Sequence, residues 1–394
     1  MKWEKVSLRD YTTKIGSGVT PKGGASVYQD SGVALFRSQN IYNGSFFDKG
    51  LAFINEVIAE KMKSVEVLEG DVLLNITGDS VARCCYAPVD FLPGRVNQHV
   101  AIVRADKEKL HSKFLMYQLI SPFMQNTMLS YAEGAGATRN ALTKGIIEDL
   151  KINLPPLPTQ RKIASILSAY DDLIENNLKR IKLLEERAFA SYKLIVKSEK
   201  LIEGKVGDLA DVKSGYAFKS RDWSEEGFPV IKIKNIGNND IELTDCSFIP
   251  ESIAEAANKF KLNAGDLLIA MTGATVGKIG MMPKTETSFY LNQRVGIFKP
   301  KVENAELFLF CFFNEPTAKN AVESLASGAA QPNISGGQLE SIKLYYPKIE
   351  TVTEFGNFIK SHFELIWNLK EQNTKLREAR DILLPKLMNG QIEV

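Results

Sequence analysis

The sequence lacks the features that mark membrane and secreted proteins. No apolar run approaches the 18 residues of a transmembrane helix. The opening segment MKWEKVSLRDY contains no apolar stretch of the kind that signal peptides carry. The four cysteines, Cys84, Cys85, Cys246 and Cys311, have neither metal-binding nor disulfide-framework spacing. We therefore expect a protein of the reducing cytoplasm whose cysteines are small packing residues.

Catalytic motifs are also missing. The three histidines lie far apart in the sequence, and no nucleophile–base pair and no glycine-rich cofactor loop after a strand is recognisable. The segment GATVGK at 273–278 lacks one spacer residue and the Ser/Thr of a phosphate-binding loop. The chain is therefore expected to have no catalytic residues, no metal and no cofactor of its own.

What the chain does have is the composition of an ordinary globular protein. Its 394 residues are 44% hydrophobic and 24% charged, enough for two or three domains with proper cores. The formal net charge of +2 neither favours nor excludes a nucleic-acid partner, because a basic face can be hidden in a neutral total.

The dominant pattern is an internal duplication. LEGDVLLNITGDSVARC in the first half matches LNAGDLLIAMTGATVGKIG in the second, and RVNQHVAIVRA matches YLNQRVGIFKP. The same 195 positions separate Gly70 from Gly265 and Asn97 from Asn292. A fixed offset over such distances indicates two copies of one block rather than chance.

Each block is followed by a segment that predicts a long helix, at about 159–196 and 351–387. The second has apolar residues at alternating steps of three and four, as in a heptad pattern, if His362 and Gln372 take two seam positions. A helix of 37 residues spans roughly 55 Å, too long to pack on one small domain alone. We expect the two helices to pair as an antiparallel coiled coil, with the blocks about a local two-fold axis. The expected seams consist of Ile163, Ile166, Tyr170, Leu173, Asn177, Ile181, Leu184, Ala188 and Ser191 in the first helix, and Phe355, Phe358, Leu365, Leu369, Leu376, Ala379 and Leu383 in the second.

Further apolar residues, Leu178, Leu183, Phe189, Ile359, Ile366 and Trp367, are expected on the outer sides of the pair, where a third protein would dock. A helix that packs only on its own block is the alternative.

Within the first block, a strand with its following turn is expected at 33–44, and further strands at 72–76 and 95–106. A short helix is expected at 54–63, and a helix at 112–128 that Pro122 kinks or divides. The second block repeats this order.

The turn segments of both blocks are rich in side chains that bind DNA. Arginine and lysine hold phosphates, and arginine, asparagine and glutamine read base edges with two hydrogen bonds. The candidate DNA-binding residues of the first block are Lys22, Arg37, Ser38, Asn40, Thr77, Arg83, Arg95, Gln98, Arg139 and Asn140. Those of the second block are Lys219, Arg221, Lys232, Lys234, Asn235, Thr272, Lys278, Arg294, Gln331 and Asn333. For any one of them, a solvated surface residue is the simpler interpretation. The repeated pairs Asn97-Gln98 and Asn292-Gln293 are open to a structural role as well.

The chain contains GD-hydrophobic-TG turns at 70–78 and 265–273, an LNQR stretch from Leu291, a PPLPTQRKIASIL segment and the closing LLPKLMNGQIEV. In these segments and in their order, the sequence resembles type I restriction–modification specificity subunits. The resemblance covers essentially the whole chain. One departure is PKIETVTEFGNFI at the start of the second helix, which lacks the Gln160-Arg161 pair of the first.

The resemblance implies an α+β protein with two similar mixed α/β target recognition domains, at 1–157 and 201–349. The long conserved helices, at 158–200 and 350–394, would space these domains and dock two methyltransferase subunits. Each domain would read one half of a bipartite site on double-stranded DNA. SAM would bind the partner subunits that methylate adenine N6, and ATP and Mg²⁺ would bind two restriction/translocase subunits where these exist.

An alternative of another class is a protein-binding assembly scaffold without direct DNA readout. Retention on duplex DNA that falls steeply with salt would distinguish the two, because phosphate contacts release counterions.

Overall fold

The computed structural model describes residues 3–134, 140–237, 239–326 and 332–394. The chain divides into two compact units. Unit 1 comprises Met1–Glu175 and Asn373–Val394, and unit 2 comprises Asn176–Gln372. Each unit therefore contains one of the duplicated blocks together with a part of each long helix.

Unit 1 is built on two four-stranded sheets. The first is antiparallel, in the order β2 (Thr12–Ser17), β11 (Val100–Ala105), β8 (Asp71–Asn75) and β9 (Cys84–Tyr86). The second runs β6 (Ala52–Ile54), β3 (Val33–Phe36), β10 (Gly94–Val96) and β7 (Glu66–Val67), with β3 and β10 parallel. Two smaller pairs are β1 (Glu4–Ser7) with β12 (Lys151–Leu154), and β4 (Ile41–Tyr42) with β5 (Ser45–Phe46). The helices are α1 (Glu56–Lys61), α2 (Ser112–Ile120), α3 (Pro122–Gly134) and α4 (Lys144–Asp149).

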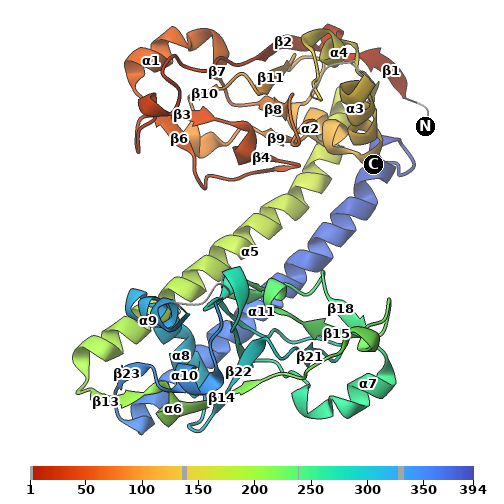
Figure 1. The fold of residues 1–394 in the computed structure, drawn as a ribbon. Helices are drawn as coiled ribbons and strands as arrows, with labels where there is room; N and C mark the ends of the chain where they lie inside the picture. The colour runs from red at the N-terminus through yellow and green to blue at the C-terminus, as the bar shows by residue number, and fades with distance from the viewer. Residues whose placement is uncertain (1–2, 135–139, 238, 327–331) are drawn as a thin grey trace. The chain divides into compact units, whose positions relative to one another are not determined.

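Unit 2 repeats this topology (Figure 1). Its antiparallel sheet is β14 (Ala210–Ser214), β22 (Val295–Pro300), β19 (Leu267–Ala270) and β20 (Ile279–Met281). Its second sheet is β18 (Ser247–Ile249), β15 (Phe228–Ile231) and β21 (Tyr290–Leu291), again with one parallel pair. The smaller pairs are β13 (Ile202–Lys205) with β23 (Lys343–Tyr346), and β16 (Ile236–Gly237) with β17 (Asp240–Ile241). The helices are α6 (Val206–Leu209), α7 (Glu251–Ala256), α8 (Ala305–Asn314), α9 (Pro316–Ala326) and α10 (Gly336–Glu340). The predicted duplication is thereby confirmed, although the second sheet of unit 2 has no strand equivalent to β7.

The central strand of unit 1 shows why this sequence folds locally as it does. All five residues of β8 are buried, and they pair with β11 on one side and β9 on the other. Asp71 at its start is fully buried and accepts two hydrogen bonds from Arg104, at 2.7 and 2.8 Å. Its second oxygen also accepts the amide of Leu68, so the carboxylate holds the turn that precedes the strand. Hydrogen bonding to Asp71 raises the pKa of Arg104 above its ordinary value.

The predicted long helices are confirmed as α5 (Leu157–Ser198) and α11 (Ile349–Met388). In unit 1, the side-chain amide of Asn373 donates to the carbonyl of Ile174 at 3.4 Å, and Arg380 pairs with Asp171 at 2.6 Å. In unit 2, Ile181 packs with Ile366, and the rings of Tyr192 and Phe355 lie 6.3 Å apart. In each unit the numbers rise along one helix as they fall along the other, so the pairing is antiparallel.

The predicted seam of these helices is wrong at four positions. The side chains of Leu173, Phe358, Leu365 and Gln372 are exposed, whereas the next residue in each case is buried, namely Ile174, Ile359, Ile366 and Asn373. The helices bury a face shared with the blocks, not only with each other. The ring of Phe310 on α8, for example, lies 5.0 Å from that of Phe363 on α11. Ile359 is buried in the core of unit 2 and Ile366 against Ile181 of α5, so both were wrongly expected on the outer side. Phe189 and Trp367 are partly buried against the same core, whereas Leu178 and Leu183 are exposed as predicted.

Other segment predictions have mixed outcomes. The divided helix is confirmed as α2 and α3, which meet at Ser121-Pro122. The single strand expected at 95–106 is wrong, because residues 97–99 separate β10 from β11 and these strands belong to different sheets. In the described part of the chain, no helix has the length and apolarity needed to cross a membrane.

Candidate functional site

The break between β10 and β11 forms a turn, here called turn 97–99, that joins the two sheets of unit 1. The amide of Asn97 donates to the carbonyl of Phe36 at 3.1 Å, and its carbonyl accepts the amide of Val100 at 3.1 Å. Its side-chain oxygen accepts the amide of His99 at 3.1 Å. Asn97 is buried and holds the turn closed, and the next side chain, Gln98, is exposed.

Turn 292–294 of unit 2 is built in the same way. Asn292 donates its amide to Ile231 at 3.1 Å, and its side-chain oxygen accepts the amide of Arg294 at 3.1 Å. Asn292 is as buried as Asn97, and both Gln293 and Arg294 are exposed. The structural role that the sequence left open is thus confirmed for the two asparagines, whereas the glutamines are left facing solvent.

The backbone of a glycine packs directly against each turn. Gly18 donates its amide to Val100 at 2.9 Å, and a Cβ atom added there would lie 2.0 Å from the carbonyl oxygen of Val96. At Gly215 the same atom would lie 2.2 Å from the carbonyl oxygen of Leu291. No real Cβ atom approaches an oxygen so closely. Any other residue would push the turn out of place.

The Thr-Gly segments lie against the other side of the turns. In unit 1 the amide of Ile76 donates to the carbonyl of His99 at 3.0 Å, and Thr77 bridges to Ala141. In unit 2 the amide of Met271 donates to the carbonyl of Arg294 at 3.0 Å, and Thr272 bridges to Asn333. The structure thus brings the candidates Thr77, Gln98 and Asn140 together in unit 1, and Thr272, Arg294 and Asn333 in unit 2.

Cations and aromatic rings flank the turns. In unit 1, the guanidinium of Arg37 lies 5.2 Å from the ring centre of Tyr28 and donates to the carbonyl of Gly50 at 2.5 Å. Arg83 lies 5.0 Å from the ring of Tyr42. Ser38 is half-buried, and its carbonyl accepts the side-chain amide of Asn75.

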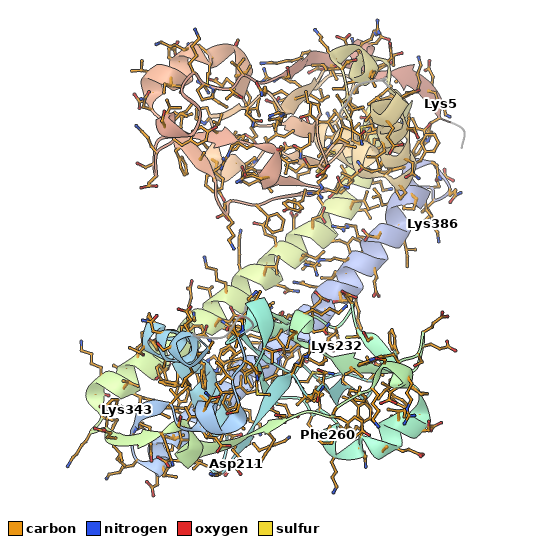
Figure 2. All side chains as sticks on the ribbon, viewed as in Figure 1. Lys5, Asp211, Lys232, Phe260, Lys343 and Lys386 are labelled. Atoms are coloured by element: carbon orange, nitrogen blue, oxygen red, sulfur yellow. The ribbon has the colours of Figure 1, made fainter. Side chains whose placement is uncertain are left out.

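In unit 2, the ammonium of Lys232 (Figure 2) lies 3.5 Å from the ring centre of Trp223 and donates to Ser247 at 2.7 Å. Burial, followed by the charge of Lys234, lowers the pKa of Lys232 below its ordinary value. Lys234 itself pairs with Asp245 at 2.8 Å. An anion placed here would relieve the repulsion between the two lysines.

Three candidates are corrected by the structure. Arg95 is 4% exposed, donates to the carbonyls of Ala59 and Gly94 at 2.9 Å each, and pairs with Glu66 at 3.0 Å. Asn40 and Asn235 are fully buried. Their side-chain oxygens accept the amides of Arg37 and Lys232, which holds a short turn in each unit. The side chains of Arg95, Asn40 and Asn235 are buried and bonded to groups of the protein, so the prediction that they contact DNA is wrong.

The remaining candidates differ in how far the structure describes them. Lys22, Lys219, Arg221 and Lys278 are exposed and remain candidates by charge alone. Arg139 and Gln331 lie outside the described residues. Sequence reasoning missed His99, which was treated as an isolated histidine. The signal that could have identified it is its alignment with Arg294, 195 positions later in the duplicated block.

The described residues include no group of three His, Cys, Asp or Glu side chains placed to hold a metal ion. Burial raises the pKa of the thiols of Cys84, Cys85 and Cys311 above its ordinary value, as expected for packing residues.

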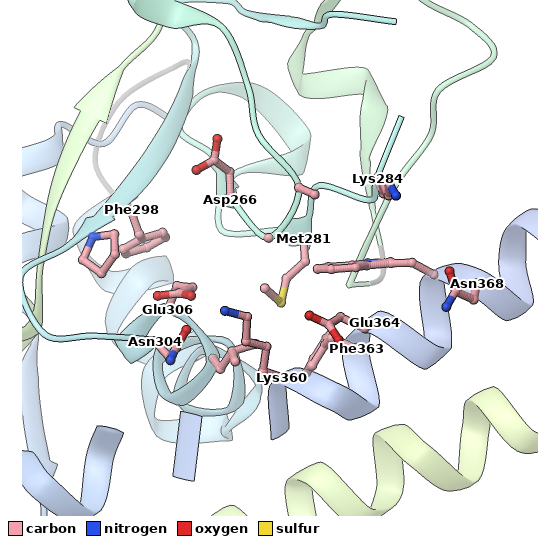
Figure 3. Close-up of a pocket in the computed structure, with 15 residues that line it drawn as sticks. Asp266, Met281, Lys284, Phe298, Asn304, Glu306, Lys360, Phe363, Glu364 and Asn368 are labelled. Atoms are coloured by element: carbon pink, nitrogen blue, oxygen red, sulfur yellow. The ribbon is translucent and has the colours of Figure 1, made fainter. Parts of the chain in front are cut away.

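Unit 2 also contains a cavity of about 480 Å³ between α11, the start of α8 and the start of β19. Figure 3 shows Glu306 and Lys360 facing it. Burial raises the pKa of Glu306, and the charge of Lys360 opposes that rise. The cavity begins at Asp266, at the opposite end of β19 from Thr272, and so does not adjoin turn 292–294.

Comparisons with a family model, with related sequences and with solved structures all point to the same family. The family described as "Type I restriction modification DNA specificity domain" matches residues 1–186 and 199–378. The type I restriction enzyme MjaVIII specificity subunit of Methanocaldococcus jannaschii is 27% identical over 368 residues, which cover 87% of this chain and 85% of that protein. The EcoKI specificity subunit of Escherichia coli is 23% identical over 429 residues, covering 99% of this chain and 89% of that protein. The crystal structure of a type I restriction–modification S subunit from M. genitalium matches with a TM-score of 0.65 at 18% identity, over 98% of this chain and 96% of that one.

Proposed function

Because this chain belongs to the family of type I restriction–modification DNA specificity domains, we propose that it directs methylation to a bipartite DNA sequence. Turn 97–99 and its neighbours would read one half of the site, and turn 292–294 and its neighbours the other. The observation that carries this proposal is that one backbone turn is built twice and presents different side chains. Two recognition surfaces that share one backbone geometry but differ in their side chains suit an asymmetric, bipartite DNA site.

The chemistry of each surface supports the division of labour that DNA recognition needs. Exposed lysines such as Lys22 and Lys278 can hold phosphates, which fixes the protein on the duplex without reading its sequence. Gln98, Gln293 and Arg294 are exposed at the turns and carry the fork-shaped groups that read base edges. The base contacts would therefore come from rigid turns that are held by buried asparagines.

We assign the outer faces of α5 and α11 to two methyltransferase subunits. On α5 in unit 2, Leu183 and Leu194 are 63% and 66% exposed, and Leu178 is 49% exposed. Large apolar side chains repeated along one helix favour a protein partner over a purely solvated face. These partners would supply SAM, the catalytic residues and the flipping of the target adenine. Where restriction/translocase subunits join, they would use ATP and Mg²⁺.

The helices would also set the unread gap between the two half-sites. This spacing role follows from the proposal that both units bind one duplex at the same time. It does not require any catalytic group in this chain.

The test is to co-express the full chain with the methyltransferase subunits of its own system in a host without adenine methylation, and to map N6-methyladenine by sequencing. A bipartite motif with an unread gap is expected. Replacing residues 1–150 with the equivalent block of a relative should change one half of the motif only. A change in both halves would contradict independent reading by the two blocks.

A protein-binding scaffold is the competing function, and the exposed leucines of α5 are compatible with it. For the assembled complex, a steep loss of duplex DNA binding between low and moderate salt is expected if the blocks contact phosphates. Binding without a salt slope would favour the scaffold.

A further inference from the structure

The two turns share their backbone hydrogen bonds but differ at the third side chain. Unit 1 has His99 where unit 2 has Arg294, and both residues donate their amide to the preceding asparagine side chain. Both also accept an amide from the neighbouring strand end, Ile76 in unit 1 and Met271 in unit 2. The side chains of residues 99 and 294 therefore start from matched positions.

In unit 1, His99 links two polar side chains. Its Nδ1 lies 2.6 Å from the hydroxyl of Thr77, and its Nε2 lies 3.3 Å from the side-chain nitrogen of Gln98. A neutral imidazole satisfies both contacts when Nδ1–H donates to Thr77 and Nε2 accepts one N–H of Gln98.

This arrangement has a consequence for Gln98. One amide N–H is engaged by His99, which leaves the carbonyl oxygen and the second N–H of an exposed side chain. One acceptor beside one donor complements the N6 amino group and N7 of adenine in the major groove. His99 thus orients the amide, and Gln98 presents it.

The described residues of unit 2 show no such linkage. The hydroxyl of Thr272, equivalent to Thr77, is buried and has no hydrogen-bond partner among the described residues. Arg294 is exposed beside Gln293. A guanidinium has only donors, in a planar fork that matches the O6 and N7 acceptors of guanine.

From these differences we propose that Gln98, oriented by His99, reads an adenine in one half-site, and that Arg294 reads a guanine in the other. The inference rests on the proposed function and adds the base class that each turn selects. Gln98 and Arg294 are the base-reading residues, and His99 is a positioning residue.

The test in unit 2 uses Arg294→Ala and Arg294→His in the complete chain, assembled with its methyltransferase subunits. Methylation is measured on a randomised duplex library and read by sequencing. Arg294→Ala is expected to lower the preference for guanine at one motif position on the order of tenfold to a hundredfold. Arg294→His places an imidazole next to Thr272 and Gln293 and is expected to shift that position towards adenine.

The matched control in unit 2 is Lys259→His. Lys259 is exposed after α7, and the change removes the same positive charge as Arg294→His. The control should keep the motif. A motif that Arg294→Ala leaves unchanged would overturn the inference. An equal rate loss on all sequences would do the same, because it would indicate a phosphate contact.

In unit 1, Gln98→Ala is expected to abolish the adenine preference at one position of the other half-site. His99→Ala should relax the same position, and His99→Gln should restore part of the preference, because its amide can replace the Nε2 contact. Stability measured by thermal unfolding separates a lost fold from a lost base contact. A relaxed position that His99→Gln does not rescue would contradict the positioning role. If the wild-type complex yields no bipartite motif, the proposed function fails instead.

Discussion

Substituting Gly18 by alanine tests whether the geometry of turn 97–99 governs recognition. The added Cβ atom would lie 2.0 Å from the carbonyl oxygen of Val96 and 2.4 Å from that of Asn97. Contacts shorter than 3.0 Å are essentially never observed for real Cβ atoms, so these groups must separate by about 1 Å. Both obstacles are backbone atoms, and no flexible side chain can absorb the shift.

A displacement of about 1 Å is enough to break hydrogen bonds between Gln98 and a base edge. Overpacking of this kind costs about 1–3 kcal/mol, so a lower melting temperature is expected as well. In the methylation assay, Gly18→Ala should relax one half of the motif, with a loss of cognate preference on the order of tenfold or more. The half read by unit 2 should stay unchanged.

Gly16 on β2 provides the matched control, because an added Cβ there meets nothing within 4 Å. Gly16→Ala should retain both the motif and the melting temperature. Gly215→Ala should repeat the effect in unit 2, where the Cβ would lie 2.2 Å from the carbonyl oxygen of Leu291. Wild-type specificity in both Gly18→Ala and Gly215→Ala would refute the idea that these turns read DNA.

Inserting four residues in each of α5 and α11 lengthens the pair by about 6 Å and should widen the unread gap by about two base pairs, as motif mapping would reveal; an unchanged gap would reject the spacing role. Burial, then the charges of Arg161 and Lys113, lowers the pKa of His111, whose Nδ1 accepts the amide of Phe114 at the start of α2. The unfolded state then takes up the proton more readily, so stability should fall as pH drops below about 6.5, and His111→Asn should flatten this dependence in denaturant titrations. Arg104→Ala leaves the fully buried Asp71 without its ion-pair partner and should lower the free energy of unfolding by about 3 kcal/mol. Lys299→Ala removes a single 3.4 Å contact to Asp266 and should lower it by less than about 1 kcal/mol. Hydrogen exchange of the amides of β8 and β19 would measure both losses of stability. Equal losses would contradict the stronger structural role given to the Arg104–Asp71 pair.

The fold was largely predictable because the same pattern of segments occurs in both halves of the sequence. The offset between Gly70 and Gly265 identified the duplication, and the apolar periodicity identified α5 and α11 to within a few residues. Pro122 correctly marked the junction of α2 and α3. Signals of this kind are local or repeated, and they do not depend on which side chains meet in space.

The seam of the helices was less predictable, because apolar residues are adjacent in each helix. Leu365 and Ile366 are equally apolar, and the contact of Ile366 with Ile181 on α5 decides that Ile366 is the buried one. The same limitation applies to the strand predicted at 95–106. The polar run Asn97-Gln98-His99 in its middle marks a change of sheet, which the side-chain hydrogen bond of Asn97 stabilises.

The candidate site was predicted as a set of residue types rather than as a geometry. Arg95 and Gln98 are both polar and near each other in sequence, yet Arg95 is buried against Glu66 and Gln98 is exposed. Composition cannot separate them, because the difference arises from where β10 ends: all three of its residues are buried, and Gln98 lies in the turn that follows. Structure was needed to identify His99 as the group that contacts Thr77 and Gln98.

A genome-wide map of N6-methyladenine in the source cell, compared with the same cell lacking this chain, tests bipartite recognition most directly. Methylation is expected at one bipartite motif, with two unequal halves and a fixed unread gap, and should disappear when the chain is removed. A contiguous motif, or a methylation pattern that persists without the chain, would contradict it.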